Sequence, residues 1–301
     1  MEKRKRVMAL GFFDGIHVGH AALLNKTKDM AAELNASPSV LTFDIHPDNI
    51  VFNREVPLIN SASDREDIIR REFGIDNVVF IHFNRKVMQM DWKAFVDEII
   101  SELDVCGMVV GYDFCLGYKG LGTAEKLKEY CGELGIACEI IPAVKVGGET
   151  VSSTTIRKLI EAGEIEKANE YLGHAHTLAD TVRSGYHLGT KLGTPTINMK
   201  FPEGVIVPKY GVYAAKVFLE DGSQHVAVTN IGIRPTVSDE NSVSVESFIL
   251  DFNGNLYDRH VRVEFYKFLR PERKFSSPEE LARQINHDAE TTKAYFQNKK
   301  A

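Results

Sequence analysis

The chain has 301 residues and a formal net charge of −6, with 44% hydrophobic and 26% charged residues. This composition is typical of a globular protein long enough for two domains, and its acidic balance argues against a nucleic-acid scaffold. The first apolar run, 7–10, is broken at Gly11 and Asp14, which predicts neither a signal peptide nor a membrane span. The four cysteines lie between 106 and 138 without C-x-x-C spacing, so we expect reduced thiols and a cytoplasmic protein.

In the first half of the chain, short apolar runs alternate with segments of helical periodicity. The expected strands are 7–10, 39–43, 77–82, 107–111 and 137–141, and the expected helices are 21–34, 91–103 and 123–134. This alternation of strands and helices predicts a parallel sheet with helices on both faces.

From about residue 177 the pattern changes to short β-rich runs separated by turns. The expected strands are 211–218, 225–229, 243–252 and 260–268. Several close strands without helices between them predict a β-barrel or a sandwich. A capping box at Ser277–Glu280, with Pro278 at the first helical position, predicts a terminal helix. The fold class is therefore α/β plus β, with domains at 1–176 and 177–301.

The stretch GFFDGIHVGH, residues 11–20, follows the first expected strand and precedes the first helix. Ligands of open α/β sheets bind at the carboxyl ends of strands, and the amides at a helix start can hold an anion. His17 and His20 are three residues apart, so their imidazoles share one face and can donate hydrogen bonds to phosphate. The alternative is a glycine-rich turn with two surface histidines. The stretch is not a Walker A loop, because no Gly-Lys-Ser/Thr follows.

The segment H-x-G-H at 17–20 resembles the signature of the nucleotidyltransferase superfamily, and the hydroxyl-rich segment 151–157 resembles its second motif. The resemblance implies attack on the α-phosphate of ATP with release of pyrophosphate. It makes His17, His20 and Arg157 catalytic, with Arg157 neutralising the leaving phosphates. The residues that it places on ATP are Gly11, Phe12, Phe13, Asp14, Gly15, Ser152, Ser153, Thr154 and Arg157.

Two further segments are similar to those of bacterial FAD synthetases. The run 41–47 resembles their TF-D-HP segment, and 110–114 with Gly117 resembles their G-DF-FG segment. The resemblance implies FMN contacts from four residues, namely His46, Pro47, Asp113 and Phe114. Cys115 and Leu116 stand where arginine and phenylalanine are common in that family.

The C-terminal half resembles riboflavin kinase at 192–198, 230–236, 245–252 and 269–275. The resemblance places Mg²⁺ on Thr196 and Asn198 and makes Glu246 the catalytic base, which fits the preference of Mg²⁺ for oxygen ligands. The implied ATP-binding residues are Gly185, Gly189, Gly193, Pro195, Thr196 and Asn198, and the implied flavin-binding residues are Asn230, Arg270 and Phe275.

Taken together, these motifs span nearly the whole chain in the order found in bacterial bifunctional riboflavin kinase/FAD synthetases, and the chain resembles that family. The resemblance implies a Rossmann-like nucleotidyltransferase domain at 1–176 and a small antiparallel β-barrel with a terminal helix at 177–301. It implies that riboflavin and ATP give FMN, and that FMN and ATP give FAD. Flavins and ATP are then the partners, with neither nucleic acid nor membrane expected, and the sequence gives no oligomeric state.

Several positions depart from the family pattern around the kinase motifs. His187 and Leu188 stand where glycine and arginine are usual, Ile197 replaces alanine, and Asp258 replaces glycine. The junction 173–176 reads Gly-His-Ala-His in place of Gly-Arg-Pro-Tyr. One alternative is therefore an FAD synthetase with a weakened or inactive kinase barrel. Another is a flavin- or nucleotide-binding regulator, for which we would expect His17, His20, Arg157 or Glu246 to be missing; all four are present.

Overall fold

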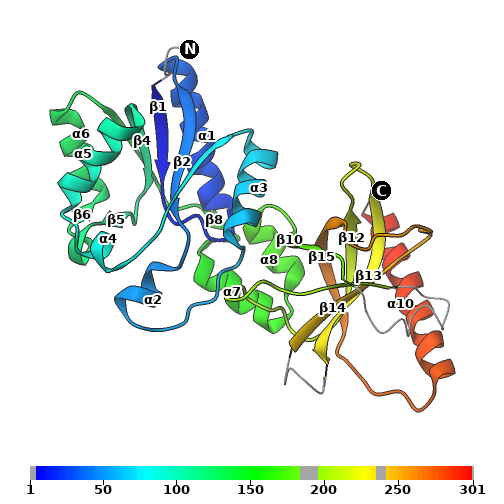
Figure 1. The fold of residues 1–301 in the computed structure, drawn as a ribbon. Coiled ribbons are helices and arrows are strands. Elements are labelled where there is room, and N and C mark those ends of the chain that lie inside the picture. Colours follow the sequence, from blue (N-terminus) through cyan, green and yellow to red (C-terminus); the bar gives the residue numbers. More distant parts are fainter. Residues whose placement is uncertain (1–4, 184–195, 235–241, 300–301) are drawn as a thin grey trace. The chain divides into compact units, whose positions relative to one another are not determined.

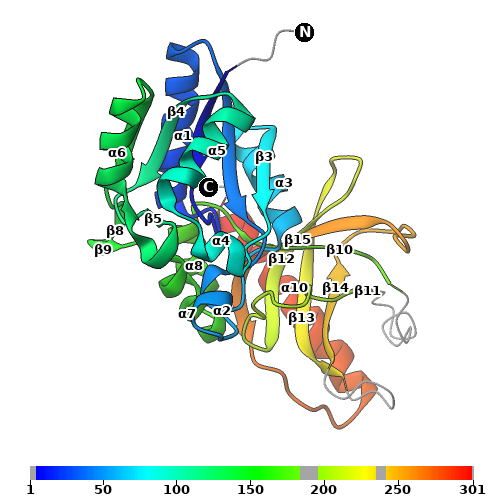
Figure 2. The same cartoon turned by 60° about the vertical axis from the view of Figure 1, so that its left-hand side comes forward.

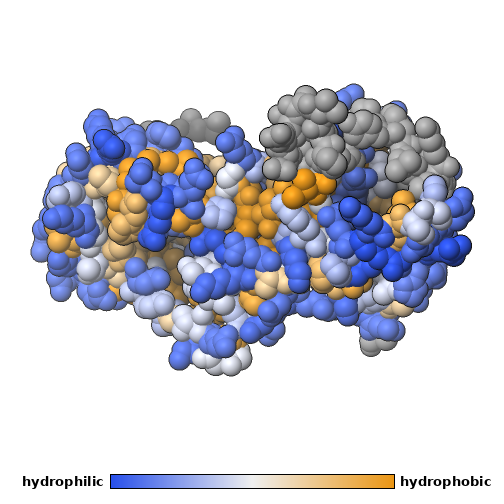
Figure 3. All heavy atoms as spheres, turned by 90° about the horizontal axis from the view of Figure 1, so that it is seen from below, coloured by the Kyte–Doolittle hydropathy of each residue, from blue (hydrophilic) through white to orange (hydrophobic). Residues whose placement is uncertain are grey.

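The computed structural model describes residues 5–183, 196–234 and 242–299. The chain forms two compact units, Met1–Ser153 and Thr154–Ala301 (Figure 1). Within the described residues, no helix has the length and apolar character needed to cross a membrane. On the face drawn in Figure 3, hydrophilic residues cover most of the surface, with smaller hydrophobic areas between them.

The first unit is built on a five-stranded sheet in the order β3-β2-β1-β4-β7. Its strands are β1 (Arg6–Leu10), β2 (Ser37–Phe43), β3 (Asn77–Ile81), β4 (Val105–Gly111) and β7 (Ala137–Ile141). All neighbouring pairs are parallel, as the sequence predicts. The chain order runs outward from β1 through β2 to β3 and then resumes at β4 on the other side of β1. Such a reversal is where open α/β sheets bind ligands, and the loop after β1 begins there.

Helices cover both faces of this sheet (Figures 1 and 2). The helices that cover it are α1 (Val18–Glu33), α3 (Ala62–Phe73), α5 (Trp92–Leu103) and α6 (Ala124–Glu133). Alternation along β1 sends Val7 and Ala9 into one apolar cluster with α1 and α3, and Met8 and Leu10 into another with α5 and α6. Helix α3 is absent from the expectations, because its apolar residues are few and its surface is charged.

Short elements follow four of the sheet strands, β2, β3, β4 and β7, in the chain. They are α2 (Pro47–Val51), α4 (Arg85–Gln89), β5 (Cys115–Leu116), the 3-10 turn Tyr118–Gly120, β6 (Gly122–Thr123), β8 (Lys145–Val146) and β9 (Glu149–Thr150). All four cysteines are free thiols, as expected.

The second unit is a six-stranded antiparallel sheet in the order β10-β15-β12-β13-β14-β11, which confirms the predicted β-rich half. Its strands are β10 (His176–Thr181), β11 (Thr196–Met199), β12 (Gly211–Phe218), β13 (Gln224–Arg234), β14 (Ser242–Ile249) and β15 (His260–Arg270). Its helices are α7 (Ser153–Ala162), α8 (Ile165–Leu172) and α10 (Pro278–Asn298).

The terminal helix α10 begins where the sequence predicts. Ser277 is its N-cap and accepts a hydrogen bond from the amide of Glu280, with Pro278 in the first turn. Ala289 of this helix packs in an apolar cluster with Val212 and Val228 of the sheet. The helix therefore covers the part of the sheet where β12 and β13 run side by side.

Candidate active sites

The loop between β1 and α1 has a backbone that few side chains tolerate. Phe13, Gly15 and Ile16 all have positive φ, at 53°, 83° and 44°. For a β-branched residue such as Ile16 this conformation is rare and strained, by about 1–3 kcal/mol. Phe13 and Ile16 are both fully buried, so apolar burial offsets the strain and fixes the loop.

His17 and His20 lie against each other at the start of α1. Their rings stack with centroids 3.7 Å apart and planes 12° apart. His17 is the N-cap, and its Nδ1 accepts a hydrogen bond from the amide of His20 at 3.3 Å, so a neutral His17 ring carries its proton on Nε2. Gly19 permits this arrangement, because a Cβ there would lie 3.0 Å from the His17 ring.

The environment keeps the His20 imidazole neutral. Burial lowers the pKa of His20 well below its usual value, and the nearby charges of His17 and Arg65 lower it further. A neutral imidazole donates one hydrogen bond and carries no charge. The pair therefore offers hydrogen-bond donors to an anion at the carboxyl end of β1, where the sequence predicts the phosphate site.

Asp14 is fully buried and connects the loop after β1 to other segments of the chain by hydrogen bonds. Its Oδ1 accepts hydrogen bonds from the amides of Ile59 and Asn60 at 2.8 and 3.4 Å. Its carbonyl accepts a hydrogen bond from the hydroxyl of Ser153 at 2.9 Å, which joins the two nucleotidyltransferase motifs. The sequence did not reveal the partners at Ile59 and Asn60, because they depend on the packing of a segment far along the chain.

The predicted flavin segment after β2 meets the predicted ATP loop. The rings of Phe12 and His46 make an edge-to-face contact with centroids 4.9 Å apart. His46 also has a structural role as the N-cap of α2, since its Nδ1 accepts a hydrogen bond from the amide of Asp48 at 3.2 Å. Pro47 begins that helix. Two segments that are separate in sequence thus share one edge of the sheet.

The other two predicted flavin residues follow β4. Asp113 is exposed, and Phe114 is partly buried against the apolar cluster on the α5 and α6 face. Cys115 is exposed within the short strand β5. The predicted ATP residues Thr154 and Arg157 belong to the second unit, on helix α7, where Arg157 is buried.

A row of predicted kinase residues crosses the antiparallel sheet of the second unit. Asn198 of β11 is opposite Glu246 of β14, and Glu246 is opposite Asn230 of β13. Val212 of β12 is opposite both Asn230 and Arg270 of β15. Residues directly opposite on neighbouring strands point to the same face. The register therefore places Asn198, Glu246 and Asn230 in adjacent positions on one face, as a common site requires.

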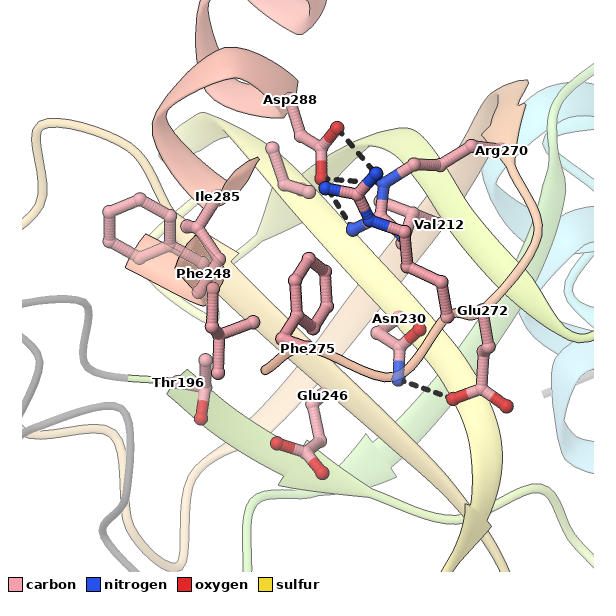
Figure 4. A pocket seen from close by; sticks show the side chains of 13 residues that line it. Thr196, Val212, Asn230, Glu246, Phe248, Arg270, Glu272, Phe275, Ile285 and Asp288 are labelled. Carbon is pink, nitrogen blue, oxygen red and sulfur yellow. Dashed lines mark hydrogen bonds and ion pairs between the residues drawn. The ribbon is translucent and has the colours of Figure 1, made fainter. Parts of the chain in front are cut away.

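A cavity of about 200 Å³ lies over this row. Its lining combines polar groups, including Thr196, Glu246 and Asn230, with apolar groups such as Phe275 and Ile285. Figure 4 shows the polar groups on one side of Phe275 and the Arg270–Asp288 ion pair on the other. A flat aromatic ring with a polyhydroxylated tail has this same division into apolar and polar parts.

Two polar contacts in the cavity were not expected from the sequence. The side-chain amide of Asn230 donates a hydrogen bond to Oε1 of Glu272 at 3.1 Å. Gly232 makes room for it, because a Cβ at that position would lie 2.0 Å from the same oxygen. Arg270 forms a charge-assisted pair with Asp288 of α10, with Nη2 2.8 Å from Oδ2. Neither contact could be predicted from the sequence, because both depend on how segments that are separate in the chain pack together.

The structure explains two of the departures from the family pattern. Ile197 is buried on the face of β11 opposite to Thr196 and Asn198, so its bulk does not lie among the predicted metal ligands. Asp258 has a φ of 62°, which is the left-handed conformation that favours glycine. The remaining predicted kinase positions lie outside the described residues; they are His187, Leu188, Gly185, Gly189, Gly193 and Pro195.

Two family models match the chain. Residues 1–155 match the model described as FAD synthetase, and residues 172–296 match the model described as riboflavin kinase. Both matches agree with the order of the motifs. Together they cover the two compact units except for part of α7 and α8 and the final residues.

Curated relatives match over nearly the full length. A bifunctional riboflavin kinase/FMN adenylyltransferase from Listeria monocytogenes is 35% identical over 97% of this chain and 92% of the relative. One from Bacillus subtilis is 33% identical over 99% of this chain and 94% of the relative. A solved structure described as a macrolide-efflux protein from Streptococcus pneumoniae is 27% identical, with a TM-score of 0.85 over 97% of this chain and 95% of that one.

Proposed function

The chain belongs to the family of bifunctional riboflavin kinase/FMN adenylyltransferases, and we propose which of its residues carry each of the two reactions. The enzyme phosphorylates riboflavin with ATP to give FMN, and it transfers the adenylyl group of ATP to FMN to give FAD and pyrophosphate. We assign the first reaction to 177–301 and the second to 1–176, which includes Arg157 on α7. The cross-strand row of Asn198, Glu246 and Asn230 is the observation that carries the kinase assignment.

In adenylyl transfer, a phosphate oxygen of FMN attacks the α-phosphorus of ATP. This oxygen is already anionic at neutral pH, so the protein need not supply a base. The His17 and His20 rings donate hydrogen bonds to the phosphate oxygens as charge builds up on them. Arg157 neutralises the departing pyrophosphate. ATP lies against the loop after β1 and the second motif, with contacts from Gly11, Phe12, Phe13, Asp14, Gly15, Ser152, Ser153 and Thr154. FMN lies against the segments after β2 and β4, with contacts from His46, Pro47, Asp113 and Phe114.

In riboflavin phosphorylation, the ribityl hydroxyl attacks the γ-phosphorus of ATP. Glu246 accepts the proton of that hydroxyl as the new bond forms. The flavin ring lies in the apolar part of the cavity, against Phe275 and between Asn230 and Arg270. ATP approaches over Thr196 and Asn198, with the glycines at 185, 189 and 193 and Pro195 as the remaining predicted contacts.

The donor set at the kinase site fits Mg²⁺. Thr196 and Asn198 are two apart on β11 and so share one face, where they present a hydroxyl and an amide oxygen beside the Glu246 carboxylate. In the described part of the chain, no group of three or more His, Cys, Asp or Glu is placed to hold a metal. Two side-chain oxygens fill only part of the shell of Mg²⁺, so the ion would arrive with ATP and keep phosphate oxygens and waters as its other ligands. When bound, Mg²⁺ neutralises the charge of the transferring phosphate.

We also place the enzyme in the cytoplasm, where its four free thiols would stay reduced.

The assignment of both activities is tested by incubating the protein with Mg-ATP and separating the flavins. One reaction contains riboflavin and the other contains FMN. We expect FMN and FAD from the first and FAD from the second; FAD from the second alone would mean that the kinase site is silent.

A further inference from the structure

Arg65 of helix α3 is completely buried beneath the adenylyltransferase site. Its Nη1 donates to the carbonyl of Phe12 at 2.8 Å and to the hydroxyl of Thr42 at 3.2 Å. Its Nη2 donates to the carbonyls of Phe43 and Asp44 at 2.8 and 3.4 Å. A buried arginine is rare, and this one directs Nη1 and Nη2 at backbone carbonyls and one hydroxyl rather than at a carboxylate.

These contacts join the two substrate segments. Phe12 belongs to the loop after β1, whereas Thr42 and Phe43 end β2 and Asp44 follows it, just before His46. The hydroxyl of Thr42 also donates to the Phe12 carbonyl, at 2.7 Å. The backbone on either side of the Phe12–His46 ring contact is therefore held by one side chain from a third element.

Aromatic rings hold the guanidinium in place. Its central carbon lies 5.0 Å from the centroid of the Phe12 ring and 5.4 Å from that of Phe80. Such cation–π contacts favour a planar, delocalised cation over an ammonium. A lysine at this position could keep the positive charge, but its single ammonium group could not make the hydrogen bonds of both Nη1 and Nη2.

The charges around Arg65 are arranged to tolerate its burial. Burial lowers the pKa of Arg65, and the nearby carboxylates of Asp14 and Asp44 act in the opposite direction. Burial lowers the pKa of His20, and the charges of His17 and Arg65 lower it further. Asp44 is itself paired with His82, whose Nδ1 lies 2.7 Å from Oδ2.

We propose that Arg65 is a positioning residue for adenylyl transfer, which sets the distance between the ATP loop and the flavin segment by fixing the Phe12 carbonyl to the end of β2. The proposal rests on the proposed function of that site. It gives Arg65 no contact with substrate; its effect on the reaction passes through Phe12 and His46.

The test compares Arg65→Lys with Arg70→Lys, which changes an exposed arginine on the same helix. Because misplacing bound reactants slows the chemical step, we expect Arg65→Lys to lower kcat for FAD formation by about 10- to 100-fold. We expect the KM for ATP to change much less, and riboflavin phosphorylation by the same preparation to stay normal. Arg70→Lys should match the parent protein in every measurement.

A purely structural role is distinguished by active-site titration. If Arg65→Lys only reduced the folded fraction, kcat per active site would be unchanged, and that result would overturn the proposal. Should Arg65→Lys not fold, Thr42→Val removes the hydroxyl contact to Phe12 at nearly constant volume. We then expect a smaller loss of kcat with the same unchanged KM for ATP, and an unchanged kcat would again overturn the proposal.

His20→Ala separates failure of this inference from failure of the site assignment. If His20→Ala abolishes FAD formation while Arg65→Lys and Thr42→Val are both normal, the site stands and the positioning role falls. If His20→Ala has no effect on FAD formation, the proposed site itself is wrong.

Discussion

The guanidinium of Arg270 and the carboxylate of Asp288 form a two-point ion pair between the last strand and the terminal helix. Nη2 lies 2.8 Å from Oδ2 and Nε lies 3.2 Å from Oδ1. The Asp288 side chain is only 5% exposed, and Gln284 donates to its Oδ1 at 2.7 Å. Nη1 of Arg270 donates to the carbonyl of Pro271. Arg270 and Asp288 both line the cavity of the second unit, so their ion pair joins β15 to α10 within its wall.

The first prediction concerns this pair. Asp288→Ala leaves the charge of the Arg270 side chain, which is only 19% exposed, without its partner, so we expect the free energy of unfolding of the second unit to fall by about 3–5 kcal/mol. Because Asp288 lines the cavity, the KM for riboflavin should rise as well. Denaturant unfolding and FMN formation measure the two effects. Glu290→Ala, a change at an exposed position two residues further along the helix, should alter neither the free energy of unfolding nor the KM for riboflavin. If both variants gave the same values, the role of the ion pair would be contradicted.

The second prediction concerns the close contact at Gly232. In Gly232→Ala the new Cβ must displace the Glu272 carboxylate, which would otherwise lie 2.0 Å away, and the hydrogen bond to Asn230 is lost. Glu272 is the flexible end of a long side chain, so we expect little loss of stability but a higher KM for riboflavin. FAD formation from FMN should be unaffected. Gly132→Ala, which adds a Cβ in open space on α6, is the matched control; a normal riboflavin KM in Gly232→Ala would show that the Glu272 position does not matter.

The third prediction concerns pH. Burial, with the nearby charge of His174, lowers the pKa of His176 to about 3 from its usual 6.5. Below pH 6.5 the unfolded chain binds a proton that the folded chain does not, so stability is fully present above 6.5 and falls as the pH falls. The free energy of unfolding should therefore fall by about 1.4 kcal/mol per pH unit from this group between pH 6 and 4.

His176→Leu should reduce that pH dependence. The buried imidazole packs beside Phe265, and neither of its ring nitrogens has a partner in the described structure, so an apolar side chain of similar size is tolerated. Denaturant unfolding of the second unit at pH 7 and pH 5 measures the slope. His260→Ala, at an exposed position, should keep the parental slope. An unchanged slope in His176→Leu would mean that His176 titrates normally in the folded protein.

The fourth prediction concerns the proposed magnesium ligands. Thr196→Val keeps the shape of the side chain but removes the oxygen, so FMN formation should need a higher Mg²⁺ concentration for half-maximal rate. A magnesium titration at fixed ATP gives this value. Thr181→Val, at the exposed end of β10, is the control for the loss of a strand hydroxyl. Identical titrations for Thr196→Val and the parent would remove Thr196 from the ligand set.

Most of the fold could be predicted because its elements have strong local patterns. The strands of the first unit are short apolar runs between turns, and β12 was expected with the bounds that it has. Helix α3 was missed, since only its Ser61 N-cap and the pair Ile68–Ile69 indicate a helix among charged residues. Strands β10 and β11 were missed because each is short and depends on pairing with a strand far along the chain.

The site was predictable only where its residues are neighbours in sequence. The His17–His20 pair could be anticipated from helical spacing, and the structure stacks the two rings. Arg65, Glu272 and Asp288 could not, because their partners are set by tertiary packing. The row through Glu246 depends on strand register, which the apolar pattern fixes only after the strands are paired.

The central claim is that two separate sites carry the two reactions, and crossed variants test it most directly. His20→Ala and Glu246→Gln are each purified and given Mg-ATP with either riboflavin or FMN, and the flavin products are separated. We predict that His20→Ala makes FMN but no FAD, and that Glu246→Gln makes FAD from FMN but no FMN from riboflavin. Loss of both reactions in either folded variant would contradict the account.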